Sequence, residues 1–166
     1  MQVTYCEVWS DQFRSPTDEM TEEAARARDK KGELYCVVLG SPTSPEAVLE
    51  VVWKNSYLGV EFIDDLGRTH TKYIFQKIES GKLFMTEVVI WTYPEGARFE
   101  FEAEVIESVF FRPDGYVRRT VDDNTSDRKE ITEYADVPLD ANWEPVPEFG
   151  YWESVARYDR ESALGV

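Results

Sequence analysis

The segment Tyr57–Val121 contains four short turns that each end in glycine: Asp65-Leu66-Gly67, Glu79-Ser80-Gly81, Pro94-Glu95-Gly96 and Pro113-Asp114-Gly115. Each turn lies between runs rich in β-branched and aromatic residues, which favour strands. A three-residue hairpin loop ends in a left-handed residue, a conformation that glycine adopts without a steric penalty. The segment therefore predicts five consecutive antiparallel strands, a β-meander.

Loop length decides which residues of the meander face one another. With three-residue loops, the facing pairs are Tyr73 with Glu87, Phe75 with Met85, Thr69 with Trp91, Trp91 with Phe99, and Val89 with Phe101. Two-residue loops would instead place Phe99 and Phe101 on the face opposite Trp91. We favour the first register because it gathers the rings into one core. A slip in the apolar alternation near Ile106 predicts a β-bulge there.

The chain before the meander predicts a strand, a helix and a second strand. Gln2–Trp9 alternates apolar and polar residues, as a half-buried strand does. Ser15-Pro16 suits the start of a helix and Gly32 suits its end. Leu34–Leu39 has the continuous apolar character of a buried strand. Residues 44–53 fit either a short helix or a strand.

The chain after the meander predicts a sixth strand, from Lys129 to Ala135, and then an irregular strap that begins at Asp136. Three prolines before Phe149 exclude regular structure there, and aromatic residues favour packing across the sheet. We expect one α+β domain over residues 1–166. Its strongly curved antiparallel meander, half-barrel or barrel-like, would have about six to eight strands, with one N-terminal helix and the C-terminal strap. Both faces of the central strands carry apolar residues, so we expect both to be covered.

Charge restricts the partners of the protein, because 33 acidic and 18 basic residues give a net charge of −15. Such a surface repels nucleic acid and anionic lipid, so we expect neither nucleic-acid nor membrane binding, and it attracts a basic protein. The N-terminus lacks the features of a signal peptide, which favours a cytoplasmic location. Cys6 and Cys36 either pair or, as we favour, remain buried thiols.

One candidate site is a polar pocket inside the curved sheet. Glu87 interrupts an apolar strand, and the favoured register places it on the inner face, where burial raises the pKa of a carboxyl group. Glu61 and Tyr73 fall on the same face, which gives a set of acid–base groups. His70 is the only histidine and has no nucleophile motif beside it. The competing interpretation is a structural hydrogen bond from Glu87 to a tyrosine or threonine, or a different register that leaves Glu87 outside.

The motifs that identify common enzymes are absent from the sequence. It has no P-loop, dinucleotide fingerprint, nucleophile elbow or zinc-ligand spacing, so it predicts no cofactor and no metal site. Whether the protein is an enzyme stays open. A small-molecule-binding protein or an enzyme that uses the polar pocket is therefore the second hypothesis, and a nucleic-acid mimic is the third.

The first hypothesis places a protein interface on the strap. Aromatic side chains would anchor the partner and acidic ones would speed its approach. The residues are Trp143, Glu144, Glu148, Phe149, Tyr151, Trp152 and Glu153. In size, acidity and the Phe110–Gly115 hairpin, the chain loosely resembles bacterial immunity proteins and similar small inhibitors. That resemblance implies a non-enzymatic protein that neutralises a basic partner, such as a toxin or nuclease domain.

Overall fold

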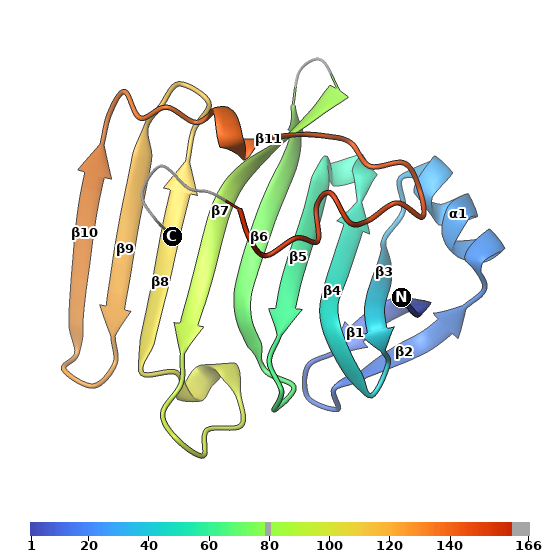
Figure 1. Ribbon diagram of the computed structural model, residues 1–166, viewed down its shortest axis with the longest axis horizontal. Coiled ribbons are helices and arrows are strands. Elements are labelled where there is room, and N and C mark those ends of the chain that lie inside the picture. The colour runs from blue at the N-terminus through green and yellow to red at the C-terminus, as the bar shows by residue number, and fades with distance from the viewer. Residues whose placement is uncertain (79–80, 161–166) are drawn as a thin grey trace.

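The computed structural model describes residues 1–78 and 81–160, and its main element is one antiparallel sheet (Figure 1). The 11-stranded sheet has the order β10-β9-β8-β7-β6-β5-β4-β3-β1-β2, and β11 pairs with β7. The strands are β1 Val3–Ser10, β2 Ser15–Met20, β3 Tyr35–Ser41, β4 Ser44–Val52, β5 Tyr57–Ile63, β6 Thr69–Ile78, β7 Lys82–Thr92, β8 Val105–Phe111, β9 Val117–Asp123, β10 Arg128–Tyr134 and β11 Trp143–Pro145. The helices are α1 Glu22–Lys31 and the 3-10 helices η1 Trp53–Asn55, η3 Glu100–Glu102 and η4 Asp140–Asn142.

The predicted α+β fold with a large antiparallel meander is confirmed. The sheet does not close, because β10 and β2 lie at its two edges, and it has more strands than we predicted. The five strands predicted within Tyr57–Val121 are β5 to β9, in sequence order. Two residues of the predicted Glu79-Ser80-Gly81 turn lie outside the described range. The strands on either side of this turn, β6 and β7, pair antiparallel as expected. None of the helices within the described residues is long and apolar enough to cross a membrane.

The connection from β7 to β8 differs from the predicted hairpin. Residues 93–104 form a loop that contains η3, and Trp91 faces Ile106 of β8 without a bulge there. The Glu102 carboxylate accepts hydrogen bonds from the backbone N–H groups of Arg98 and Phe99, at 2.8 and 2.9 Å. These bonds hold a compact turn where we expected a strand. The predicted pairs that fail are Thr69–Trp91, Trp91–Phe99 and Val89–Phe101.

A β-bulge changes the register between β6 and β7. Phe75 faces Met85 as predicted, but a shift beside this pair places Glu87 opposite Ile74 instead of Tyr73. A shift of one residue moves a side chain to the other face of a sheet. Tyr73 and Glu87 therefore lie on opposite faces, and the expectation that they share a pocket is wrong.

The helix begins later than we predicted. Residues Ser15–Met20 form β2, which pairs with β1, and Thr21 caps α1 by accepting a hydrogen bond from the Ala24 N–H at 3.2 Å. Pairing with β1 gives the backbone of Ser15–Met20 its hydrogen bonds, so this segment needs no helix. Gly32 ends α1 as predicted, with a left-handed φ of 73°. The ambiguous segment forms a strand, Ser44–Val52.

The larger hydrophobic core lies on the face of the sheet that carries Tyr73 and Phe75, which we call the front face. The strap, residues 136–160, runs across this face (Figure 1), as we predicted, but it contains η4 and the short strand β11, where we expected no regular structure. Trp152 of the strap is only 2% exposed and packs into this core together with Val155. Ala25 of α1 joins the same core at the β1–β3 end of the sheet.

A smaller core lies on the opposite, back face, behind β3 and β4. Its members are Cys6, Trp9, Cys36, Val38, Val48 and Ile63. Strand β1 contributes Cys6 and Trp9, so the N-terminal hairpin covers the back face at this end of the sheet. Cys6 and Cys36 face each other across β1 and β3 as buried free thiols.

Candidate functional site

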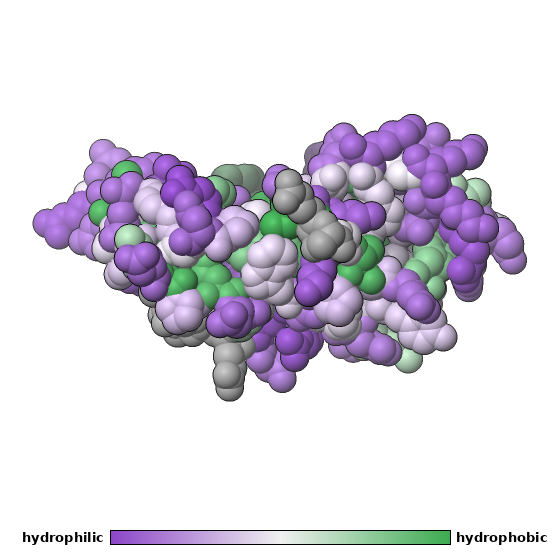
Figure 2. Space-filling model, turned by 90° about the horizontal axis from the view of Figure 1, so that it is seen from above, coloured by the Kyte–Doolittle hydropathy of each residue, from purple (hydrophilic) through white to green (hydrophobic). Residues whose placement is uncertain are grey.

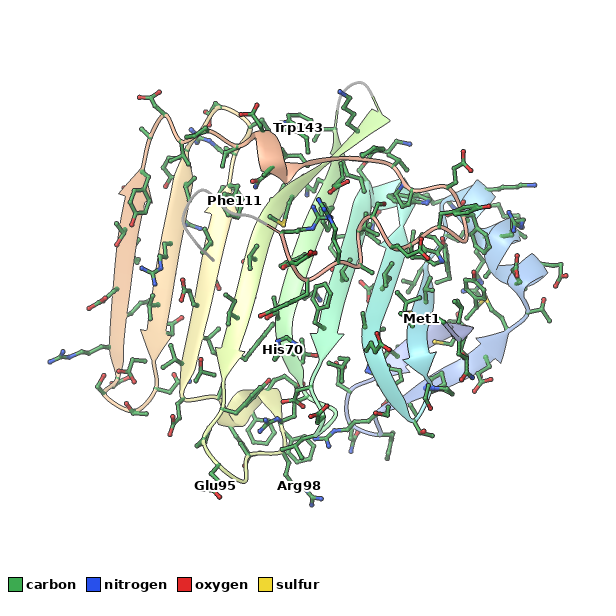
Figure 3. All side chains as sticks on the ribbon, viewed as in Figure 1. Met1, His70, Glu95, Arg98, Phe111 and Trp143 are labelled. Carbon is green, nitrogen blue, oxygen red and sulfur yellow. The ribbon has the colours of Figure 1, made fainter. Side chains whose placement is uncertain are left out.

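The space in front of Tyr73 is filled by the strap. Tyr73 is buried, and its hydroxyl donates a hydrogen bond to the Tyr158 carbonyl at 2.9 Å, while burial raises the pKa of Tyr73 to about 12. His70 (Figure 3) packs against the same strap residue. The His70 and Tyr158 ring centroids are 5.2 Å apart, and His70 Nδ1 is 3.0 Å from Thr71 Oγ1. Burial lowers the pKa of His70, which favours its neutral form. These two residues therefore support the packing of the strap.

Glu61 lies on the back face and is neutralised by a lysine. Lys72 Nζ donates to its carboxylate at 2.7 Å, and Thr69 Oγ1 donates at 3.3 Å. Burial opposes the charge on Lys72, but the Glu61 carboxylate raises the pKa of the lysine. Because Glu61 and Tyr73 are on opposite faces, the acid–base set that we predicted is not assembled.

A cavity of about 50 Å³ lies beside Glu61 on the back face. It is lined by Trp9, Asp11, Cys36, Val48, Glu50, Gly59 and Glu61. Burial and the nearby Glu61 charge raise the pKa of Asp11 to about 6. The described residues contain no group of histidine, cysteine or acidic side chains arranged to hold a metal ion. The cavity has room for little more than water.

The back face of β6 to β9 has no covering layer. Among residues 1–78 and 81–160, no helix or strand is stacked on it, contrary to our expectation that both faces are covered. Its half-buried side chains, which we call the open face, are Ile74, Glu87, Val89, Trp91, Ile106 and Phe110. Strand pairing places them together, because residues that face each other across strands share a side of the sheet: Ile74 with Glu87, Glu87 with Phe110, and Trp91 with Ile106. Figure 2 looks onto the upper ends of the strands, where hydrophobic patches lie among mostly hydrophilic residues.

A groove of about 350 Å³ lies at one end of the open face. It is lined by Tyr57, Ile74, Gln76, Ile78, Phe84, Thr86, Glu87, Phe110, Phe111, Arg112 and Pro113. Trp143 of β11 extends this aromatic surface, because it pairs with Phe84 of β7 with 4.9 Å between ring centroids and stays 37% exposed. Figure 3 shows Trp143 at the end of the strands opposite Glu95 and Arg98.

Glu87 is the one acidic side chain in this groove. It is half-buried and, within the described residues, forms no ion pair. A carboxylate on an apolar surface is poorly solvated, so an incoming cation would gain a strong charge-assisted hydrogen bond. The ring of Tyr57 lines the same groove and offers a face on which a guanidinium group can stack, whereas Arg118 already lies over the Phe110 ring, 5.8 Å from its centroid. Arg112 also lines the groove, but its guanidinium pairs with Asp114 at 2.8 Å, so Glu87 is left to receive an arginine or lysine side chain of a partner.

The predicted strap interface divides into buried and exposed residues. Trp152 and Glu144 are buried, and Glu144 Oε1 accepts hydrogen bonds from Arg160 at 2.6 Å and from Arg157 at 3.2 Å. Phe149 stacks on Tyr5, with 5.3 Å between ring centroids. These residues fasten the strap to the sheet. The exposed ones are Trp143, Glu148, Tyr151 and Glu153.

Comparison with known proteins finds no matching family model, no matching curated protein and no matching solved structure. The function must therefore be argued from the chemistry of the surface. Val89, Trp91 and Ile106 of the open face were not part of any predicted site. The sequence signal for them was the apolar character of both faces of β7, which we attributed to a second covering layer.

Proposed function

We propose that the protein is a non-enzymatic binding protein that neutralises a basic protein partner, as immunity proteins and inhibitors do, and that the partner docks on the open face. The observation that carries the proposal is Glu87. This carboxylate lies half-buried in an apolar groove on an uncovered sheet face, and no cation among the described residues pairs with it. A basic side chain of the partner supplies the missing charge.

The open face has the composition of an interface centre. Trp91 and the exposed Trp143 are of a residue type that dominates binding energy in protein complexes, and Phe110 is of a type enriched at interface centres. Contiguous apolar side chains that stay partly exposed mark interaction surfaces. A partner that covers them gains hydrophobic stabilisation in addition to its contact with Glu87.

The charge of the whole molecule supports a basic partner. A net charge of −15 raises the rate of encounter with a cationic protein at low salt. The exposed acidic residues Glu148 and Glu153 of the strap add to the negative electrostatic field of the molecule, although they do not line the groove on the open face. We include in the proposal a cytoplasmic location, where Cys6 and Cys36 would remain reduced.

Affinity capture with the purified protein tests the proposal. Lysate of the source cell is passed over the wild type and over Glu87→Lys, and the retained proteins are identified by mass spectrometry. We expect one basic protein on the wild type, released by moderate salt and reduced at least about tenfold on Glu87→Lys, because a buried like charge opposes docking. The captured protein is then purified, and its affinity is measured for Glu87→Gln and Phe110→Ser.

Two matched variants make the result specific. Glu23→Lys changes the same charge on the exposed side of α1, and Glu153→Lys changes it on the strap. Both should keep most of the binding. If Glu153→Lys removes binding and Glu87→Lys does not, the partner docks on the strap and the open face is not its site. Retention of only acidic or neutral proteins would contradict a basic partner.

A further inference from the structure

The two edges of the sheet differ in whether they can accept another strand. β2 contains Pro16, which has no N–H group, and Asp18, whose left-handed φ of 53° interrupts the strand. Both features block pairing at a sheet edge. β10, at the other edge, is seven residues long, and all seven pair with β9 without a register shift. Its outer backbone groups have no strand partner within the described part of the chain.

Every residue of β10 is exposed, and the central one, Ile131, is 59% exposed. An edge strand of regular geometry with an apolar centre is a template for pairing with another chain. Charged residues normally protect such an edge, so the arrangement of the charges on β10 decides what can pair with it. The residues on the two sides of Ile131 are complementary, with basic Lys129 two positions before it and acidic Glu133 two positions after it: Arg128-Lys129-Glu130-Ile131-Thr132-Glu133-Tyr134.

We propose that β10 pairs antiparallel with β10 of a second copy of this chain, with Ile131 on the two-fold axis. In this register Lys129 of each copy faces Glu133 of the other, so one pairing forms two ion pairs. Ile131 faces Ile131, Glu130 faces Thr132, and the Arg128 guanidinium lies beside the Tyr134 ring. No like charges face each other, as an isologous interface requires.

Neighbouring registers lose this complementarity. If the two-fold axis passes through Glu130, Glu130 of one copy faces Glu130 of the other. If it passes through Thr132, Ile131 of one copy faces the charged Glu133 of the other. Lys129 and Glu133 lie on the back face. Lys129 faces Asp122 of β9, which faces Ile106 of β8. Glu133 faces Arg118 of β9, which faces Phe110 of β8, and both Ile106 and Phe110 belong to the open face. The paired copies therefore form one continuous sheet with both open faces on the same side.

The oligomeric state in solution tests the inference, independently of any basic partner. Sedimentation or light scattering over a range of concentrations should show a monomer–dimer equilibrium for the wild type. In the Lys129→Glu variant, the new glutamate of each copy faces Glu133 of the other copy, so a dimer contains two repulsive glutamate pairs. Glu133→Lys likewise creates two repulsive lysine pairs. Each variant should weaken the dimer by roughly ten- to one-hundredfold.

The charge swap distinguishes this register from a loss of folding. The double variant Lys129→Glu/Glu133→Lys restores opposite charges at both positions and should dimerise again. An equimolar mixture of the two single variants should form a heterodimer, because each position then faces its complement. Lys30→Glu on α1 is the control and should dimerise like the wild type. A wild type that is monomeric at all concentrations, or single variants that dimerise unchanged, would overturn the inference.

Discussion

The two ends of the sheet are built differently. At the β1–β5 end, α1 and the strap cover the front face while the N-terminal hairpin covers the back face, so fully buried side chains point both ways from β3 and β4. At the β8–β10 end, the back face is uncovered and β10 is exposed throughout. One end of the sheet therefore supplies most of the buried core, whereas the other end leaves apolar side chains and a strand edge accessible, as the proposed docking and pairing require.

The largest expected effect tests this difference directly. Leu49 of β4 is 0% exposed, and Leu49→Ala should lower the free energy of unfolding by about 2–5 kcal/mol because it leaves a cavity. Ile106→Ala on the half-exposed open face should cost about 1 kcal/mol. Urea unfolding of the two variants measures both values. Equal losses would show that the two ends contribute alike.

The next effect concerns the strap, which covers the front face between the two ends. Glu144→Gln removes the charge that pairs with Arg160, whose side chain is only 3% exposed and lies 5.0 Å from the Phe75 ring centroid. A buried arginine left without its partner should cost about 3 kcal/mol in denaturant unfolding. Glu153→Gln, on the exposed side of the strap, should change stability by less than about 0.5 kcal/mol. A neutral result for Glu144→Gln would mean that the Glu144–Arg160 ion pair does not help to hold the strap.

A smaller effect sharpens the comparison at the β8–β9 hairpin. Gly115 has a φ of 91°, and an added Cβ would lie 3.1 Å from the Val137 carbonyl oxygen. Gly115→Ala should cost about 1–2 kcal/mol, from left-handed strain and displacement of the strap. Gly96→Ala, with a φ of 81° and open space around it, carries only the strain. Thermal unfolding should therefore show the larger loss for Gly115→Ala.

The smallest effect depends on pH and belongs to the doubly covered end. The folded protein raises the pKa of Asp11 from 3.8 to about 6, so the folded state holds this proton more tightly than the unfolded state. Stability from Asp11 is therefore greatest in acid and falls as the pH rises through that range. Asp11→Asn should unfold at a higher temperature than the wild type near neutral pH and show no such gain in acid. The difference should stay below about 1 kcal/mol, because solvent screens a partly exposed carboxylate.

The strands could be predicted because turn chemistry is local. Glycine-ended turns and β-rich runs placed β5 to β9 correctly, and the Pro94-Glu95-Gly96 turn misled us only about its neighbours. That tripeptide looks like the other turns, but the Glu102 side chain binds two backbone N–H groups and diverts the chain into η3. The helix start failed for a similar reason, since Ser15-Pro16 suits a helix cap as well as an edge strand.

The candidate site was only partly predictable. Glu87 stood out because a carboxylate interrupts an apolar strand, yet one bulge between β6 and β7 turned it away from Tyr73. Trp143 was predicted as a contact residue and is exposed, whereas Trp152 is buried in the core. Sequence periodicity shows which side chains share a face, but it does not show which element covers that face. For this reason the open face was missed.

The nearly sequential order of strands has a consequence for synthesis on the ribosome. From β4 to β10, each strand pairs with the one made just before it, so the sheet can grow while translation proceeds. The strap is made after β10, so Trp152 and Val155 reach the front face only once β10 has left the exit tunnel. Until then the nascent chain displays its largest apolar surface to the cell. A ribosome that stalls before the strap would therefore release a sheet that chaperones and proteases recognise as unfinished.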